Sequence, residues 1–437
     1  MIKSRSIGIA MSFVGLLVGA GFATGQEVVQ YFTSFGFDGI WGIIVAGAIM
    51  TLAGTVFLQL GSYFHASEHN TVFRQVTHPI ISKLLDVSVI ITLFSIGFVM
   101  LAGAGSNMQQ QFGWPTWAGS TLMLVLVLAC GFLDVDKVSA VIGAVTPTII
   151  IAVAFVGVYT AMHMPADPAG MLELSAHIDS PVSHWLVSAL NYNGLALILA
   201  VSMSLVIGGD HLDPREAGWG GLWGGIIYTV LMGVAFFALL MNADKVGKSD
   251  IPMLYLLDSI HPALGFIMSI IIFLMIFNTA IGMFYALGKR LSAGREDRYL
   301  PIFIGGCLAG YAVSFFGFKT LMAYVYPVIG YIGMFMVVVL VVAWVKSLND
   351  IKDESRRRER IKALLSLKLR PDYEYDEAKD AIIGREISGS NMDDEVLFDE
   401  ALGEVADDLH NDEAVNFDAA DFDADSYDVK DYTEHKR

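Results

Sequence analysis

The chain has 437 residues, of which 55% are apolar and 16% charged, with a mean hydropathy of +0.58. Globular proteins carry about 25% charged residues, so this composition excludes an ordinary soluble protein of two or three domains. The formal net charge is −17, which excludes a nucleic-acid binder, since that class needs a basic surface. The charge is uneven: residues 1–346 have a net charge of −3 and residues 347–437 one of −14. The sequence therefore predicts a transmembrane body over 1–346 followed by a charged C-terminal region.

Ten apolar runs in the body are each long enough to cross a bilayer, which takes about 20 residues of helix. Helices are expected because lipid offers no hydrogen-bond partner to an open strand edge. The runs cover residues 6–35, 40–64, 84–110, 116–133, 138–162, 184–208, 218–242, 261–288, 299–316 and 320–346. The predicted fold class is an all-α polytopic membrane protein with about ten transmembrane helices.

The basic residues of the body sort to one side of this predicted topology. With the N-terminus in the cytoplasm, eleven Lys and Arg residues fall inside, and only Lys245, Lys248 and Lys319 fall outside. Cytoplasmic loops of membrane proteins carry such an excess of basic residues. The pattern predicts a multi-pass plasma (inner) membrane protein with both termini in the cytoplasm.

The first apolar run is rich in glycine and ends in a polar pair. Four glycines fall within residues 15–25, and Gln26 and Glu27 follow. Glycine costs about 1 kcal/mol in a helix interior relative to alanine, and a broken helix is tolerated in lipid only where it lines a cavity. A break would free carbonyl and N–H groups for cations and anions. Close helix packing is the alternative, but it does not account for Glu27. The residues expected to line a solute site here are Gly19, Ala20, Gly21, Phe22, Thr24, Gly25, Gln26 and Glu27.

The sixth run contains a second polar interruption. Asn191, Tyr192, Asn193 and Gly194 stand within otherwise apolar sequence. Runs one and six hold matching positions in a five-plus-five arrangement, and paired interruptions of this kind point to a transporter binding site. Because each half has an odd number of spans, the second half would enter the membrane from the opposite side and be inverted relative to the first. We therefore expect discontinuous helices 1 and 6, with these four residues contributing to the solute site.

The eighth run carries two adjacent polar residues, Asn278 and Thr279, in the middle of an apolar stretch. Threonine can satisfy its hydroxyl on its own helix, whereas asparagine does so less easily. The pair is interpreted either as part of a binding site or as a hydrogen bond between helices.

Enzyme signatures are absent from the sequence. It has no His-Glu-x-x-His, Gly-x-Ser-x-Gly or P-loop motif, so metal-dependent hydrolysis, serine hydrolysis and direct ATP coupling are not expected. Cys130 and Cys307 have no metal-binding or redox spacing. We expect neither enzymatic activity nor a cofactor, apart from a coupling Na⁺ ion.

The C-terminal region divides into a basic and an acidic part. Residues 352–370 hold eight basic and three acidic residues, and the segment 347–370 is predicted to be a juxtamembrane amphipathic helix lying against anionic headgroups. Residues 371–437 hold 23 acidic and five basic residues. This composition predicts a disordered tail, and docking of a cytoplasmic partner is an alternative role for it.

The stretch from Gly19 to Glu27 resembles the first helix of the YkvI-type bacterial membrane proteins, an uncharacterised family. More distantly, the body resembles the LeuT-fold transporters of the amino acid–polyamine–organocation group. That resemblance implies a sodium site between the broken first helix and the eighth helix. The residues at the matching positions are Gly15, Val18, Met275, Asn278 and Thr279. Phe22 stands where related symporters have an Asn for a second ion, so a second sodium site is not expected.

Together these features predict a secondary active transporter of a small polar or zwitterionic, amino-acid-like solute. Alternating access would be coupled to Na⁺ or, through Glu27, to H⁺. The alternative is a channel, or a membrane sensor or scaffold whose acidic tail binds a partner. The sequence leaves the solute, the direction of transport and the oligomeric state open.

Overall fold

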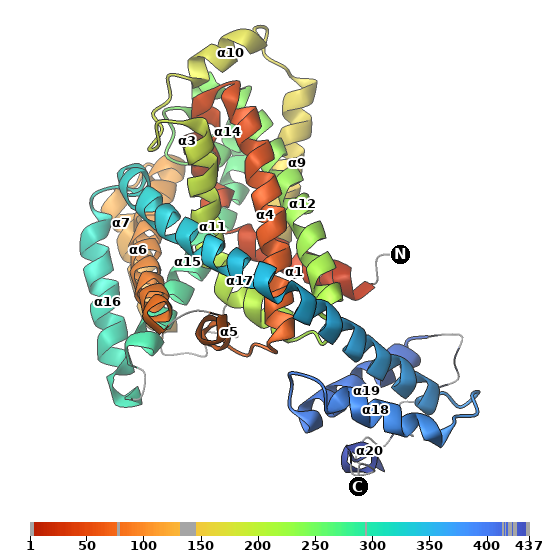
Figure 1. Ribbon diagram of the computed structural model, residues 1–437. Helices are drawn as coiled ribbons and strands as arrows, with labels where there is room; N and C mark the ends of the chain where they lie inside the picture. Colours follow the sequence, from red (N-terminus) through yellow and green to blue (C-terminus); the bar gives the residue numbers. More distant parts are fainter. Residues whose placement is uncertain are drawn as a thin grey trace.

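The computed structural model describes residues 4–76, 79–131, 146–292, 295–412 and parts of 415–433, and the regular structure in these ranges is entirely helical (Figure 1). The first half of the body contains α1 (Ser4–Leu17), α2 (Ala20–Thr24), α3 (Gln26–Tyr31), η1 (Thr33–Phe35), α4 (Asp38–Tyr63), α5 (His69–Val76), α6 (Pro79–Phe112), α7 (Thr116–Cys130), α9 (Thr146–Met162) and α10 (Pro168–Ser175). The second half contains α11 (Trp185–Gly209), α12 (Pro214–Leu240), α13 (Ala243–Val246), α14 (Pro252–Ile260), α15 (Pro262–Leu291), η2 (Glu296–Arg298), α16 (Tyr299–Ser314) and α17 (Phe318–Leu369). The C-terminal region adds η3 (Glu377–Lys379), α18 (Asp380–Ile387), α19 (Asp394–His410) and α20 (Lys430–Thr433).

Helices lie on all ten predicted apolar runs, although residues 132–133 of the fourth run and 138–145 of the fifth lie outside the described residues. In the described part of the chain, six helices are long and apolar enough to cross a membrane, namely α4, α6, α11, α12, α15 and α17. Shorter apolar helices cover 5–17, α7, α9 and α16. The chain is therefore an all-α, multi-pass membrane protein.

Local sequence sets where several long helices begin. Asp213 caps α12 by accepting a hydrogen bond from Arg215 N at 2.9 Å, and Pro214 takes the first helical position. His261 and Pro262 start α15 in the same way. A side-chain acceptor before the helix satisfies a free N–H group, and proline at the first position loses no hydrogen bond.

The long helices pack in two groups. One contains α1, α4, α11 and α12, and the other contains α6, α7, α15 and α16. The last helix, α17, lies against α4, α6 and α11. Each group thus draws two consecutive apolar helices from each predicted half of the body.

The sixth apolar helix, α11, is continuous, so the expected interruption at Asn191–Gly194 is wrong. Asn193 Nδ2 donates to the carbonyl of Ala189 at 2.9 Å within the same helix. Gly194 serves close packing, since a Cβ on it would lie 2.0 Å from the carbonyl oxygen of Gly330 in α17. Polar and small residues in this helix mark contacts with its neighbours instead of a break. The first helix, by contrast, is discontinuous.

The acidic tail differs from the expected disorder, because its described residues contain packed helices. Apolar residues of α17, α18 and α19 form a small core that is separate from the core of the body. Its buried members from α19 are Leu397, Phe398, Ala401, Leu402, Val405 and Leu409. These positions follow helical spacing, so few apolar residues suffice when all lie on one face. We call residues 347–433 the C-terminal unit.

The basic segment also differs from the expectation of a helix lying on lipid headgroups. It continues α17 without a break, giving a helix of 52 residues, and its basic side chains pair with acids of the tail. Lys362 Nζ lies 3.0 Å from Glu404 Oε2, and Lys368 Nζ lies 2.9 Å from Asp380 Oδ2. The basic segment therefore neutralises part of the negative charge of the tail.

We expect Gly194→Ala to destabilise the body, because its methyl group would collide with the backbone of α17. Overpacking of this kind costs about 1–3 kcal/mol. Gly233→Ala in α12 is the matched control, since a Cβ there meets nothing within 4 Å and alanine favours a helix by about 1 kcal/mol over glycine. Thermal unfolding in detergent measures both. Equal stability of the two variants would contradict the packing role of Gly194.

Candidate functional site

The first apolar run is broken twice. Its pieces are α1, α2 and α3, separated by Val18–Gly19 and by Gly25. Gly19 is extended (φ −91°, ψ −176°) and Gly25 is left-handed (φ 77°), a conformation that favours glycine. The sequence prediction of a break within 19–25 is confirmed.

The first break changes the hydrogen bonding of α1 at its C-terminal end. The amide of Gly19 donates to the carbonyl of Leu17 at 2.9 Å, instead of to Gly15 one turn earlier. Within the described residues, the carbonyl oxygens of Gly15 and Val18 accept no main-chain hydrogen bond across the break. Val18 is buried and Gly15 is half-buried. Two carbonyl groups are thus free to bind a cation, as the family resemblance implies.

Thr24 closes the second break with its own side chain. Its Oγ1 donates to the carbonyl of Gly21 at 2.7 Å and accepts a hydrogen bond from Gln26 N at 3.2 Å. Both groups would otherwise be unpaired at the ends of two short helices. Thr24 therefore has a structural role, and it takes up one of the N–H groups that the sequence prediction had assigned to solute binding.

The carboxylate of Glu27 folds back over α2 onto Gly21. A Cβ on Gly21 would lie 1.6 Å from Glu27 Oε1, so only glycine leaves room for this carboxylate. In the part of the chain that the structure describes, no hydrogen bond or ion pair to the Glu27 side chain is seen. Glu27 is half-buried, and an acid at membrane depth is costly and points to function.

Other buried polar atoms on neighbouring helices lack partners among the described residues. They are both polar atoms of Gln26, and the side-chain oxygens of Gln30, Asn193 and Asn278. Gln26 and Gln30 are one turn apart on α3, and α3 contacts α11. A buried polar atom without a partner costs about 1–3 kcal/mol, so atoms of this kind are suited to binding a polar ligand or ion.

Asn191 connects three helices instead of interrupting one. Its Nδ2 donates to the carbonyl of Pro327 in α17 at 2.8 Å, and its Oδ1 accepts from Tyr31 Oη of α3 at 3.2 Å. Ser188 Oγ of α11 also donates to the carbonyl of Tyr31, at 2.8 Å. The end of α3 is therefore anchored to α11 by two hydrogen bonds.

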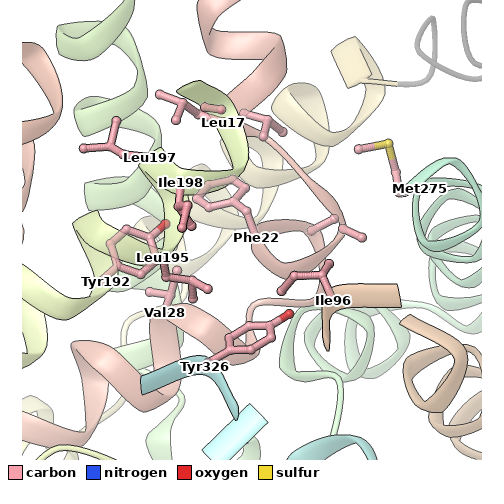
Figure 2. Packing of buried hydrophobic residues seen from close by; sticks show 14 of the residues in the cluster. Leu17, Phe22, Val28, Ile96, Tyr192, Leu195, Leu197, Ile198, Met275 and Tyr326 are labelled. Atoms are coloured by element: carbon pink, nitrogen blue, oxygen red, sulfur yellow. The ribbon is translucent and has the colours of Figure 1, made fainter. Parts of the chain in front are cut away.

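An aromatic cluster lies beside the break. The hydroxyl groups of Tyr192 and Tyr228 are hydrogen-bonded. The ring of Phe22 lies 5.5 Å from that of Tyr228, and the ring of Tyr31 lies 5.7 Å from that of Tyr192. Figure 2 shows Phe22 surrounded by apolar side chains, with the hydroxyl-bearing rings of Tyr192 and Tyr326 nearby. The sequence predicted a site role for Phe22 and Tyr192. It predicted none for Tyr31, Tyr228 and Tyr326, whose only distinguishing feature in the sequence is a hydroxyl group within an apolar run.

The broken segment contacts the helix that carries three of the predicted ion ligands, although Gly15 lies on α1 and Val18 in the first break. α2 packs against α15, which carries Met275, Asn278 and Thr279. Met275 is buried, whereas Asn278 and Thr279 are half-buried. The structure thus brings the broken segment to the eighth helix. Among the described residues, no cluster of three or more His, Cys, Asp or Glu side chains is present.

A polar cavity of about 610 Å³ lies among α6, α14 and residues 244–250. Its lining includes Gln110 of α6, Tyr255 of α14, and charged residues of both signs, which are Asp244, Lys245, Lys248 and Asp250. The wall formed by α14 contacts α2 and α3, and a Cβ on Gly25 would lie 3.2 Å from Met253 N. The volume falls in the range of small-molecule sites.

The relatives found by sequence come from Bacillus subtilis. The chain is 27% identical to the uncharacterised membrane protein YkvI over 332 residues, which cover 76% of this chain and 94% of that protein. It is 24% identical to the uncharacterised protein YyaD over 331 residues, covering 75% and 93%. These lengths are close to that of the 346-residue body. The resemblance to YkvI is thereby confirmed, while no family model matches the chain.

Solved structures of transporters share less sequence identity with this chain. A manganese transporter mutant from Eremococcus coleocola aligns with 96% of this chain and 92% of its own, at 13% identity and a TM-score of 0.47. The inward-facing conformation of Mhp1 aligns with 98% and 93%, at 11% identity and the same TM-score of 0.47. Likeness at this level is too low to transfer a function.

We expect Ser188→Ala to weaken the attachment of α3, because it leaves the buried carbonyl of Tyr31 without its partner. The cost of such a loss is about 1–3 kcal/mol. Ser204→Ala on the same helix is the control, because Ser204 is equally buried but donates only to Ala200 of its own helix. Thermal unfolding in detergent compares them, and an equal effect of both substitutions would argue against the anchor.

Proposed function

We propose that the protein is a secondary active transporter of a small polar or zwitterionic solute, coupled to Na⁺ or H⁺. The observation that carries this proposal is the first helix, which is broken twice in an apolar body and has the Glu27 carboxylate folded over the break. Transporters bind solutes and ions at discontinuous transmembrane helices, whose freed backbone groups line the site.

The surroundings of the break suit an amino-acid-like solute. Free carbonyl groups and unpaired amide side chains offer hydrogen bonds, and the aromatic cluster offers an apolar wall. The cavity among α6, residues 244–250 and α14 carries acids and lysines together, and a zwitterion presents both charges to such a lining. In this proposal, the solute lies against residues 19–27 and the polar face of α11 at Asn191–Gly194.

The helix packing supports alternating access. α1, α4, α11 and α12 form one group, and α6, α7, α15 and α16 form the other. Two groups that each combine matching helices of two halves are what an inverted repeat would produce. In this proposal one group moves against the other around the break, and both termini lie in the cytoplasm, as the basic residues indicate.

Two coupling ions are compatible with the site. Sodium would be held by the carbonyls of Gly15, Val18 and Met275 together with Asn278 and Thr279, a set of oxygen ligands that suits a hard cation. Protons would be carried by Glu27, which has no cationic partner among the described residues. The two possibilities make different predictions.

Reconstituted vesicles test transport and proton coupling together. With a panel of amino acids and an imposed pH gradient, we expect the wild type to accumulate a solute and Glu27→Gln to lose the pH-driven component. The amide keeps the shape of the carboxylate but cannot exchange the proton. Glu173→Gln in α10, outside the long apolar helices, serves as the control. No uptake under either a Na⁺ or a pH gradient would contradict the proposal, and intact pH-driven uptake by Glu27→Gln would exclude Glu27.

Sodium binding is tested by thermal stabilisation. A ligand that binds the folded state raises stability by about 2.7 kcal/mol at 100 times its dissociation constant. We expect Thr279→Ala to lose the stabilisation by Na⁺. Thr92→Ala in α6 should keep it, because Thr92 donates only to Ser88 of its own helix. Potassium at equal ionic strength controls for screening, and unchanged stabilisation in Thr279→Ala would remove this site.

A channel or a membrane sensor is the second candidate. The acidic C-terminal unit favours it, since a packed unit outside the membrane can bind a partner. Transport that persists after removal of residues 371–437, together with loss of a cellular response, would support the sensor.

A further inference from the structure

The C-terminal unit is attached to the body through one buried arginine. The Arg358 side chain in the extension of α17 is 0% exposed. Its Nε pairs with Glu354 Oε1 at 2.8 Å, which neutralises the buried charge. Such a charge is tolerated only when it is paired and fully hydrogen-bonded. Burial lowers the pKa of Arg358 and Glu354 raises it again, so the guanidinium stays charged at neutral pH.

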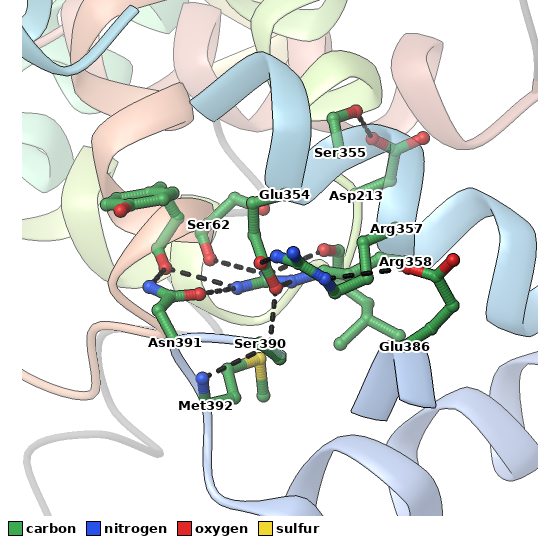
Figure 3. Close-up of polar contacts among 12 residues, drawn as sticks. Ser62, Asp213, Glu354, Ser355, Arg357, Arg358, Glu386, Ser390, Asn391 and Met392 are labelled. Atoms are coloured by element: carbon green, nitrogen blue, oxygen red, sulfur yellow. Dashed lines mark hydrogen bonds and ion pairs between the residues drawn. The ribbon is translucent and has the colours of Figure 1, made fainter. Parts of the chain in front are cut away.

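The remaining nitrogens of Arg358 reach the body. Nη1 donates to the carbonyls of Ser62 at 3.0 Å and Leu212 at 2.8 Å, and Nη2 donates to the carbonyl of Tyr63 at 3.2 Å. Nη2 also donates to Asn391 Oδ1 of the tail at 2.9 Å. Figure 3 shows these partners converging on one guanidinium. Arg358 thereby joins the end of α4, the turn between α11 and α12, and the tail.

Further hydrogen bonds connect the C-terminal unit to the body near Arg358. Ser355 Oγ donates to Asp213 Oδ1 at 2.6 Å, and Asn391 Nδ2 donates to the carbonyl of Tyr63 at 2.7 Å. Leu212 of the body contributes its side chain to the core of the C-terminal unit. Docking of the unit is therefore both polar and apolar.

A second set of contacts joins the tail to α1. Arg5 Nη1 lies 2.8 Å from Glu404 Oε2, and Arg5 Nη2 lies 2.8 Å from Asp408 Oδ1. Glu404 also accepts from Lys362 and, at 3.4 Å, from the amide of Leu212. Burial raises the pKa of Glu404, but Lys362 and Arg5 lower it below its usual value, so this carboxylate is ionised at neutral pH.

This second set of contacts holds α1. The break at Val18–Gly19 separates α1 from α2. Two residues of non-helical backbone let a helix pivot, whereas a continuous helix is stiff. α19 connects the free end of α1 to α17 and to the α11–α12 turn. The N-terminal end of the helix that precedes the break is thus tied to the tail.

We propose that the C-terminal unit is an intramolecular latch that holds the N-terminal end of α1 against α12 and the α11–α12 turn. The Arg5–Glu404 ion pair is its releasable contact, and the Arg358 cluster is its fixed base. Opening of the first pair frees α1 to pivot at Val18–Gly19 while the unit stays docked. The latch follows from these contacts and does not depend on which solute is moved.

Amide hydrogen exchange on the full-length protein in detergent tests the latch. We expect Arg5→Gln and Glu404→Gln each to raise exchange in residues 4–17 about three- to fivefold, the change expected of a partly buried ion pair. Both substitutions remove the Arg5–Glu404 pair, while Arg5→Gln also removes the Asp408 pair and Glu404→Gln the Lys362 pair. The increase in the double variant should therefore be smaller than the product of the two single increases. Arg370→Gln is the control, since Arg370 pairs with Asp372 within the tail.

Three results would overturn the latch. They are unchanged exchange in α1, additive effects of the two substitutions, and an equal rise in α16, which would indicate general loosening. An increase confined to α1 that is shared by both single variants and absent from Arg370→Gln supports it.

Discussion

Backbone polar groups in an apolar environment must find partners, and the structure of the first helix depends on how it meets this demand. Between Leu17 and Gln26 the chain leaves the helix twice. Thr24 satisfies one carbonyl and one amide, and Ser188 satisfies the carbonyl of Tyr31. The groups that no described residue satisfies lie on the pieces of the broken helix and on α11 and α15. We propose that a solute or an ion binds to them.

The break is held in place by helices that approach very closely. A Cβ on Gly61 of α4 would lie 2.1 Å from the carbonyl oxygen of Leu205 in α11, and one on Gly221 of α12 would lie 2.3 Å from the backbone of Gly54 in α4. Small residues give such contacts a large dispersion energy in lipid, where the hydrophobic effect between helices is absent. The group of α4, α11 and α12 is thus a frame on which α3 lies, whereas α2 packs against α14 and α15.

Ion pairs and charged hydrogen bonds hold the C-terminal region together and attach it to this frame. Its basic helix and its acidic tail would each be repelled by their own charge if extended, but together they form pairs such as Lys362–Glu404 and Lys368–Asp380. While these basic side chains pair with the tail, Arg358 donates to the carbonyl groups at the end of α4 and at Leu212. The large negative charge of the chain therefore belongs to a unit that is docked on the body.

The sequence by itself determined the membrane class, the positions of the apolar helices and the break in the first one, because hydrophobic length and glycine content act locally. It also placed Glu27 at the break. The tertiary structure alone decided the continuity of α11, since Asn191 and Gly194 take their roles from α3 and α17, which are distant in sequence. It alone decided the folding of the tail as well. Apolar residues too few to fold an isolated segment suffice when a neighbouring helix supplies both an apolar face and the opposite charge.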